Sequence, residues 1–214
     1  MQSSAGSAQM AAADHGRWVP LTGEVKDLAC CLYVAKSNEV ALECCRAVVR
    51  EMGAALLEVG CDVDSFQGFN EEVRQLPGKY SEDECGSLLL CVSGSCSEWE
   101  GKAADAVAIG DCVGMIAIKA APGLEGTAEI KRLFVREGAF RGKRLGRSLT
   151  FAIVHEAKRL GYTGLVLDTL VRLPHAVRLY ESMGFRQREG YVHNPMEDAL
   201  FYEASVDDVL KLEE

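Results

Sequence analysis

The sequence predicts a mixed α/β fold, in which helices pack on a central sheet. Short apolar runs of the kind found in buried strands alternate with longer segments whose apolar residues recur at helical spacing, and this alternation is typical of that class. The chain has 214 residues, of which 48% are hydrophobic and 26% charged. A chain of this size and composition can bury a full core without a metal or disulfides. These observations predict one globular domain.

Four segments are predicted to be helices from their apolar periodicity and their ends. The first covers 38–59 and is closed by Gly60, because glycine readily adopts the left-handed conformation that ends a helix. A short helix is expected at 69–75. A long helix opens after Lys143 and stops at Gly161, and a last one covers 174–184, with proline at its start and glycine at its end.

Seven segments are predicted to be strands, because they are short, rich in apolar and β-branched residues, and bounded by turn residues. They are 27–35, 87–92, 112–120, 128–135, 164–170, 185–188 and 199–204. The remaining segments complete the expected domain organisation. We expect a disordered tail at 1–25, one domain at 26–206 with a mobile insertion at 93–110, and a short extension at 207–214.

Composition excludes several classes of function. The formal net charge of −9 disfavours a nucleic-acid partner. No apolar stretch approaches the roughly 20 residues of a membrane span, so no membrane association is expected. The nine cysteines are odd in number and contain no CxxC, a pattern that predicts neither a disulfide framework nor a metal site. A reducing compartment, and therefore a cytoplasmic location, fits this pattern best.

One segment departs from the acidic character of the chain. Between Lys131 and Arg147 lie seven basic residues and one acidic residue, Glu137. The segment RGKRLGRS, which begins at residue 141, enters the long helix, whose N-terminus offers unpaired N–H groups and the positive end of its dipole. Gly142 and Gly146 leave room for a ligand close to the backbone. Basic side chains oppose the dipole at that end, so the arrangement predicts a bound anion such as a pyrophosphate. The patterns of a P-loop and of a dinucleotide fingerprint are absent.

The residues Arg141-Gly142-Lys143-Arg144-Leu145-Gly146 resemble the pyrophosphate loop of the GNAT superfamily of acyl-CoA-dependent N-acyltransferases. That loop reads Arg or Gln, two residues of any type, Gly, any residue, then Gly or Ala. Three further blocks resemble the family in the order in which it places them, and the resemblance spans residues 26–204. The blocks are 65–80, 167–185 and 191–203, of which the last resembles the bacterial-type small-molecule branch.

The resemblance implies a GNAT fold of about seven strands and four helices, with acetyl-CoA as co-substrate. It also implies transfer of the acetyl group to a primary amine by direct attack in a ternary complex. The acceptor would be a small molecule or a lysine side chain. The alternative is a non-catalytic acyl-CoA sensor or interaction module of the same fold, and the presence of both Tyr180 and Glu129 favours the enzyme.

Residue roles follow by position in the resembling blocks. Backbone groups of one strand would hold the pantetheine arm, and the loop would hold the pyrophosphate. The residues assigned in this way are Leu133, Phe134, Val135, Arg141, Gly142, Lys143, Arg144, Leu145, Gly146 and Arg147. Arg144 departs from the family, which has glycine there, and we interpret it as already helical with its side chain on a phosphate. Leu173 stands where many members have an asparagine that contacts CoA, so that contact is not expected.

Two residues are the catalytic candidates. Tyr180 matches the family's tyrosine that protonates the departing thiolate, and a tyrosine remains a proton donor at pH 7; the alternative is a tyrosine that only packs. Glu129 matches the general base of the histone-acetyltransferase branch, and the alternative is a surface carboxylate paired with Lys131. Asp168 or water could replace Glu129 as the base. His193 is the one histidine in an expected site loop.

The acceptor itself is not specified by the sequence. The net acidity of the chain weakly favours a cationic amine, such as a polyamine, an amino sugar or a lysine side chain, through electrostatic steering. The length of the acyl group and the oligomeric state are not predicted.

Overall fold

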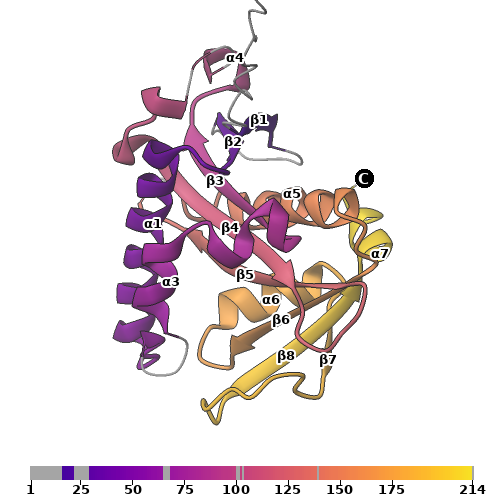
Figure 1. Ribbon diagram of the computed structural model, residues 1–214. Coiled ribbons are helices and arrows are strands. Elements are labelled where there is room, and N and C mark those ends of the chain that lie inside the picture. Colours follow the sequence, from indigo (N-terminus) through magenta and orange to yellow (C-terminus); the bar gives the residue numbers. More distant parts are fainter. Residues whose placement is uncertain are drawn as a thin grey trace, which may run out of the picture.

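The computed structural model describes residues 16–21, 29–64, 68–99, 102, 104–138 and 140–213. Its centre is an eight-stranded sheet with the order β1-β2-β3-β4-β5-β6-β8-β7 (Figure 1). The strands are β1 (Arg17–Pro20), β2 (Cys30–Val34), β3 (Ser87–Ser93), β4 (Cys112–Ala120), β5 (Thr127–Val135), β6 (Gly164–Leu170), β7 (Arg186–Arg188) and β8 (Ala199–Ser205). β5 and β6 pair in parallel, whereas the other neighbours pair antiparallel. The predicted mixed α/β class is confirmed, with one strand more than expected.

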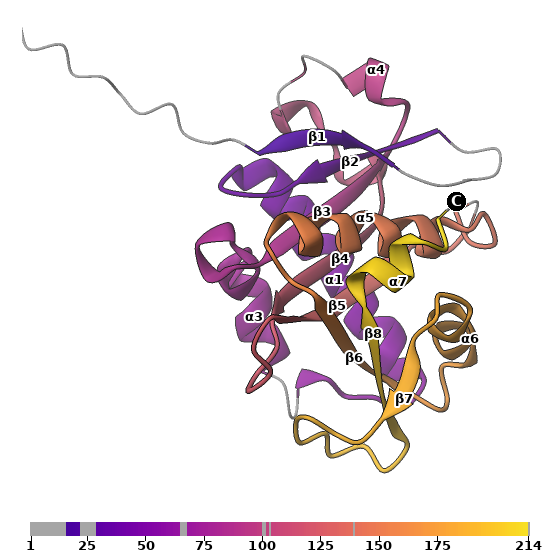
Figure 2. The ribbon, with the colours of Figure 1, turned by 90° about the vertical axis from the view of Figure 1, so that its right-hand side faces the viewer.

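Helices cover both faces of the sheet. Those in the described residues are α1 (Glu39–Glu58), α3 (Phe69–Gln75), α4 (Cys96–Trp99), α5 (Leu145–Arg159), α6 (Pro174–Ser182) and α7 (Val206–Leu210). One hydrophobic cluster joins α1 and α3 to one face, and a second joins α5, α6 and α7 to the other. Figure 2 shows α5 and α7 in front of the sheet and α1 behind it. The four predicted helices are present, and α4 and α7 are additional.

The long helices form where their sequences provide both an apolar face and end signals. α1 begins after Asn38, whose side-chain oxygen accepts a hydrogen bond of 2.9 Å from the amide of Ala41. α6 begins at Pro174, which has no N–H to leave unpaired in the first turn. These local signals explain why the predicted boundaries and the observed ones differ by only a residue or two.

The N-terminal part of the chain corrects one prediction. Residues 17–20 lie inside the predicted tail, but they form β1, an edge strand paired with β2. Arg17 is held by an ion pair with Glu156 of α5, and the Trp18 ring stacks on Trp99 with centroids 5.2 Å apart. Long-range contacts therefore order a segment that has no local strand pattern. The rest of the tail, apart from residues 16 and 21, lies outside the described residues.

The predicted insertion at 93–110 contains short helical turns where we expected loop only. It holds α4 and the 3₁₀ turns η3 (Ala104–Ala106) and η4 (Ile109–Asp111), and Trp99 is buried. α7 begins at the end of the predicted domain and continues into the predicted C-terminal extension, where Val209 is buried against α5. The domain boundaries themselves stay a prediction.

The cysteines depart in one respect from the predicted reduced state. Seven are free thiols, and most of these are buried in the two hydrophobic clusters. Cys31 of β2, in contrast, is disulfide-bonded. The cytoplasmic location therefore stays a prediction, and the state of Cys31 does not support it.

Candidate functional site

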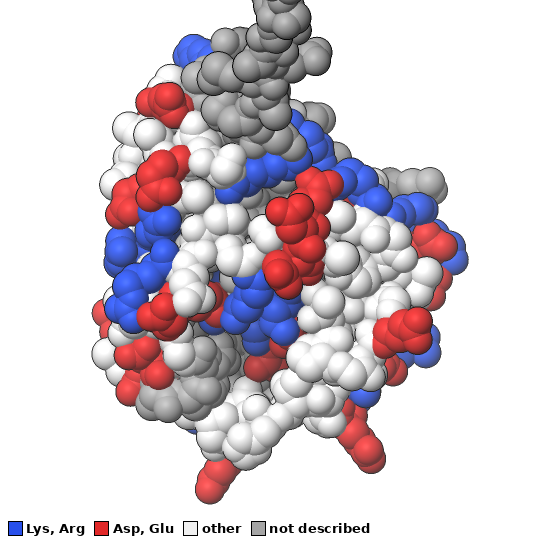
Figure 3. Space-filling model, in the orientation of Figure 1, with Lys and Arg blue, Asp and Glu red and all other residues white. Residues whose placement is uncertain are grey.

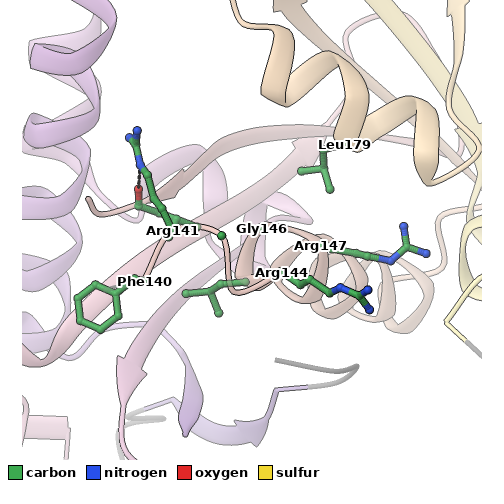
Figure 4. Close-up of a pocket in the computed structure, with 9 residues that line it drawn as sticks. Phe140, Arg141, Arg144, Gly146, Arg147 and Leu179 are labelled. Carbon is green, nitrogen blue, oxygen red and sulfur yellow. Dashed lines mark hydrogen bonds between the residues drawn. The ribbon is translucent and has the colours of Figure 1, made fainter. Parts of the chain in front are cut away.

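A cavity of about 640 Å³ lies where β5, the following loop, α5 and α6 meet (Figure 4). The loop contributes Phe140, Arg141 and Gly142, and Leu179 comes from α6. The complete lining is Val135, Phe140, Arg141, Gly142, Arg144, Leu145, Gly146, Arg147 and Leu179. The segment predicted to hold an anion therefore surrounds a real cavity.

The backbone of this loop has the conformation that an anion site needs. Gly142 has a φ of 76°, which a residue with a side chain adopts only at a cost. α5 begins at Leu145, and the amides of Leu145 and Gly146 make no hydrogen bond within the described ranges, as expected for a first helical turn. These donors line the cavity at the positive end of the α5 dipole.

The conformation of Arg144 corrects our interpretation of that residue. Arg144 is not helical: it is the N-cap of α5, with φ 63° and ψ 10° in the left-handed region. That conformation favours glycine, which explains why the resembling loop carries glycine at this position. The arginine side chain does border the cavity, so the expected role at a phosphate stays a prediction.

Three arginines flank the cavity on two sides. Figure 4 shows the side chains of Arg144 and Arg147 extending in one direction and that of Arg141 in another. Arg141 Nε donates to the Val135 carbonyl at 3.4 Å. Arg147 is more firmly held, because its guanidinium donates to the Leu212 carbonyl at 3.1 Å and stacks over the Phe151 ring at 4.9 Å. The cavity thus combines helix amides with fixed positive charge.

The sequence assigned ten residues to CoA, and seven of them line this cavity. Leu133 and Phe134 lie further back on β5, and Lys143 is in the loop but not in the lining. Phe140 and Leu179 were missed. Leu179 lies directly before Tyr180, and the pair matched the family's Leu-Tyr signature, which was a signal that could have placed it.

β5 and β6 pair at their first residues and then separate along the part of β5 that leads to the cavity. They pair through only three residues each, from Thr127↔Gly164 to Glu129↔Val166. Three residues beyond Glu129, β5 also bulges against β4 at Arg132, where φ is 59°. The last part of β5, at Leu133 to Val135, is therefore free of a β6 partner and leads to the cavity. Edge N–H and C=O groups that lack a strand partner can pair with an extended ligand, and of these groups the Val135 carbonyl already accepts from Arg141.

Tyr180 of α6 is a buried tyrosine, with 6% of its surface exposed. Its ring packs edge-on against Phe185, with centroids 5.6 Å apart. The hydroxyl makes no hydrogen bond to any residue of the described ranges. Burial raises the pKa of Tyr180, and the negative charge of Asp168 raises it further. Tyr180 is consequently a neutral O–H donor over the whole physiological pH range.

Glu129 is not the solvent-facing carboxylate of the alternative interpretation, because it is 2% exposed. It pairs with Lys119 of β4 and, at 3.2 Å, with Lys131, and it accepts a hydrogen bond of 3.0 Å from the Tyr191 hydroxyl. Burial alone would raise the pKa of Glu129, but the charges of Lys131 and Lys119 outweigh it and lower that pKa. A carboxylate held in its charged form this way is a weaker base than a free one.

The other polar candidates divide into buried and exposed groups. Asp168 accepts hydrogen bonds of 2.9 Å from Lys131 and from Asn194. Burial would raise the pKa of Asp168, but Lys131 and Asn194 lower it. His193 is exposed, and His155 lies on α5, 2.7 Å from Glu213. Neither histidine contacts the groups at the point where β5 and β6 separate.

Two further properties of the described residues bear on function. None of the helices there combines the length and hydropathy that a membrane crossing requires. In the same ranges, no three His, Cys, Asp or Glu side chains are grouped so that they could hold a metal ion.

Known proteins resemble this chain in sequence and in structure. A segment of 92 residues, 43% of the chain, is 42% identical to an uncharacterized N-acetyltransferase of Schizosaccharomyces pombe, and spans 55% of that protein. A GNAT-family acetyltransferase of Staphylococcus aureus has a similar structure, with a TM-score of 0.60 at 17% identity over 82% of this chain and 99% of that one. A putative acetyltransferase of Salmonella typhimurium, solved with its cofactor acetyl-CoA, has a TM-score of 0.54 at 19% identity over 84% and 95%. The structural similarities show the fold.

The model of the acetyltransferase (GNAT) family matches residues 69–185, more than half of the sequence. The matched region includes β5, the cavity loop, α5, β6 and α6. This chain therefore belongs to the acetyltransferase (GNAT) family.

Proposed function

We propose that the protein is an N-acetyltransferase that transfers the acetyl group of acetyl-CoA to a primary amine. The observation that carries the proposal is the cavity at the N-terminus of α5, where free helix amides and three arginines meet the unpaired end of β5. A pyrophosphate fits such a site. The pantetheine arm, which contains two amides, fits an unpaired strand edge.

The reaction follows from this placement. The amine nitrogen attacks the thioester carbon, and the C–S bond then breaks to give the acetylated amine and a CoA thiolate. Tyr180 donates its proton to that thiolate, since its hydroxyl is neutral and makes no hydrogen bond within the described ranges. The amine must lose one proton overall, either before or during the attack. Holding both substrates in one complex supplies most of the advantage over the reaction in water.

Glu129 remains our candidate for receiving that proton, directly or through water. Its three hydrogen-bonded partners and lowered pKa favour a route in which the amine is already largely neutral when it binds. The pKa of Asp168 is also lowered, so Asp168 is an equally weak base. Water is then the simplest final acceptor of the proton, with the carboxylates orienting it.

Incubation with acetyl-CoA and a panel of amines tests this function. We expect CoA release that depends on the amine, together with a product heavier by one acetyl group. Binding of acetyl-CoA without acetylation of any amine would favour the alternative, an acyl-CoA sensor. If calorimetry detected no binding of acetyl-CoA, both the acetyltransferase function and the sensor alternative would be wrong.

A further inference from the structure

A cluster of charged side chains lies on the α1/α3 face of the sheet, beside the point where β5 and β6 separate. We call it the acceptor-side cluster. Glu129, Lys131 and Arg132 come from β5, Asp168 from β6, Lys119 from β4, Glu72 from α3 and Lys79 from the turn η1 (Gly78–Tyr80). Its members are Glu72, Lys79, Lys119, Glu129, Lys131, Arg132 and Asp168.

The cluster is positively charged overall, in contrast to the chain as a whole. It contains four cations and three carboxylates, whereas the chain carries −9. In the view of Figure 3, Lys and Arg side chains gather near the centre of the molecule, with acidic side chains directly above and below them. The charge summed over the cluster therefore differs in sign from the net charge of the chain.

The carboxylates of the cluster are already occupied. Both oxygens of Glu72 accept from Arg132, at 2.6 and 2.8 Å, and one also accepts from Lys79 at 2.5 Å. The oxygens of Glu129 and Asp168 all accept from a lysine, from Tyr191 or from Asn194. An incoming ammonium group would have to displace one of these contacts.

The lysines, in contrast, keep N–H donors in reserve. An ammonium group has three donors. Lys119 uses one, on Glu129; Lys79 uses one, on Glu72; and Lys131 uses two, on Glu129 and Asp168. The remaining donors have no acceptor in the part of the chain that the structure describes. The side chains of Lys119 and Lys131 are 17% and 12% exposed, whereas that of Lys79 is 44% exposed. A positive group that is largely shielded from water and has unused donors favours an anionic ligand.

The cluster is placed to contact the acceptor. Lys131 and Asp168 lie two residues beyond the last β5–β6 pair, Glu129↔Val166. Val135, which lines the CoA cavity, is four residues further along β5, about 13 Å at strand spacing. That length is comparable to an extended pantetheine arm. A second cavity, of about 300 Å³, is lined by Glu72 and Lys79 and so adjoins the cluster.

We propose that the amine acceptor carries a carboxylate, a free amino acid being the simplest case, and that Lys119 and Lys131 bind this carboxylate. This inference rests on the proposed function. It replaces the expectation of a cationic acceptor, which was drawn from net charge alone. The neighbouring cations serve the reaction as well, because positive charge disfavours the ammonium form of the bound amine and so favours the neutral nucleophile.

The test offers matched acceptors to the enzyme with acetyl-CoA. L-methionine is compared with L-methioninamide, and L-phenylalanine with L-phenylalaninamide, while spermidine and O-phosphoethanolamine represent a cationic amine and a different anion. We expect kcat/KM to be at least tenfold higher for the acids. The amides have the more readily deprotonated amines, so a preference for the acids cannot come from amine reactivity.

Lys119→Met identifies the residue that makes the difference. It should raise KM for the preferred amino acid roughly tenfold, whereas KM for the matching amide and KM for acetyl-CoA should change little. Because Lys119 also lowers the pKa of Glu129, an effect on the chemistry through Glu129 would instead change kcat for acid and amide alike. Lys158→Met is the control, since Lys158 is an exposed residue of α5 paired with Asp207.

The outcomes separate this inference from the function on which it rests. A preference for acids that Lys119→Met removes supports it. Equal or better turnover of the amides, of spermidine or of phosphoethanolamine would overturn it while the acetyltransferase function stands. A preference for acids that survives Lys119→Met would overturn the assignment of the carboxylate to Lys119. If no amine is acetylated, the proposed function fails first.

Discussion

Replacing Arg144 by glycine should have two opposite effects, one on the apo protein and one on CoA binding. The left-handed backbone at Arg144, with φ 63°, costs a residue with a side chain about 1–2 kcal/mol. Glycine removes that cost but loses about 0.5–1 kcal/mol through its greater freedom in the unfolded chain. The net gain is about 0.5–1 kcal/mol. For a chain of this size that corresponds to a rise in Tm of about 2 °C.

The same change removes one positive charge from the cavity lining. A charge-assisted contact to phosphate contributes about 1.5–3 kcal/mol, and solvent at this exposed position reduces it to about 1 kcal/mol. Arg144→Gly should therefore weaken CoA binding about fivefold and make it less dependent on salt.

Arg144→Ala separates the two effects. Alanine also lacks the charge but keeps the side-chain penalty at positive φ, so it should lose CoA affinity as glycine does without the gain in Tm. Thermal unfolding of the apo proteins and calorimetric titration with CoA at two salt concentrations measure both quantities. The reasoning is refuted if glycine is less stable than alanine, or if both variants bind CoA as tightly as the natural sequence.

Three further predictions concern the site and its support. Gly146→Glu should abolish CoA binding, because a carboxylate enters the cavity. The control variant Gly146→Ala should fold normally, since its Cβ would lie 3.5 Å from Leu179. If CoA still raised the Tm of Gly146→Glu, the assignment of this loop to CoA would be wrong. Tyr180→Phe should lower kcat by roughly 10²–10⁴ with little change in CoA affinity, and full turnover would leave water as the proton donor. Burial would raise the pKa of Glu72, but Arg132 and Lys79 hold it at about 2, so this pair should stabilise the fold above pH 4.5 and lose that contribution as the pH falls towards 2. Glu72→Gln should lower the free energy of unfolding by about 3 kcal/mol at pH 7. It should also reduce the loss of stability between pH 4.5 and pH 2, measured by denaturant unfolding. An unchanged dependence of stability on pH would show that these ion pairs do not stabilise the fold.

Local signals were sufficient for most of the fold. The helix at 69–75 and the strands at 112–120 and 164–170 were predicted with the bounds that the structure has. Their apolar runs, caps and flanking turn residues act over a few positions, so they can be seen without tertiary contacts. β1 could not be predicted this way. Its order comes from Arg17 and Trp18 contacting Glu156 and Trp99, which lie far along the chain.

In the candidate site, too, some features follow from the local sequence and others from tertiary contacts. An anion-binding loop could be predicted from the sequence, because a glycine-bearing, basic turn before a helix is a local pattern. Most of the residues assigned to that loop line the cavity. The conformation of Arg144 could not be predicted from the local sequence. Its positive φ is imposed by the loop and by the start of α5, and an arginine in the sequence does not indicate such a conformation.

The electrostatics around the separation of β5 and β6 depend on tertiary contacts, which the sequence alone does not reveal. Lys119, Lys131 and Asp168 are separated in sequence but meet because β4, β5 and β6 lie side by side. Their burial makes each pairing strong enough to set the charge state of Glu129, and burial depends on what packs above them. Net charge, which the sequence does provide, is a sum over the whole surface. A ligand at the separation of β5 and β6 responds mainly to the few charges within about 10 Å, because salt screens the rest.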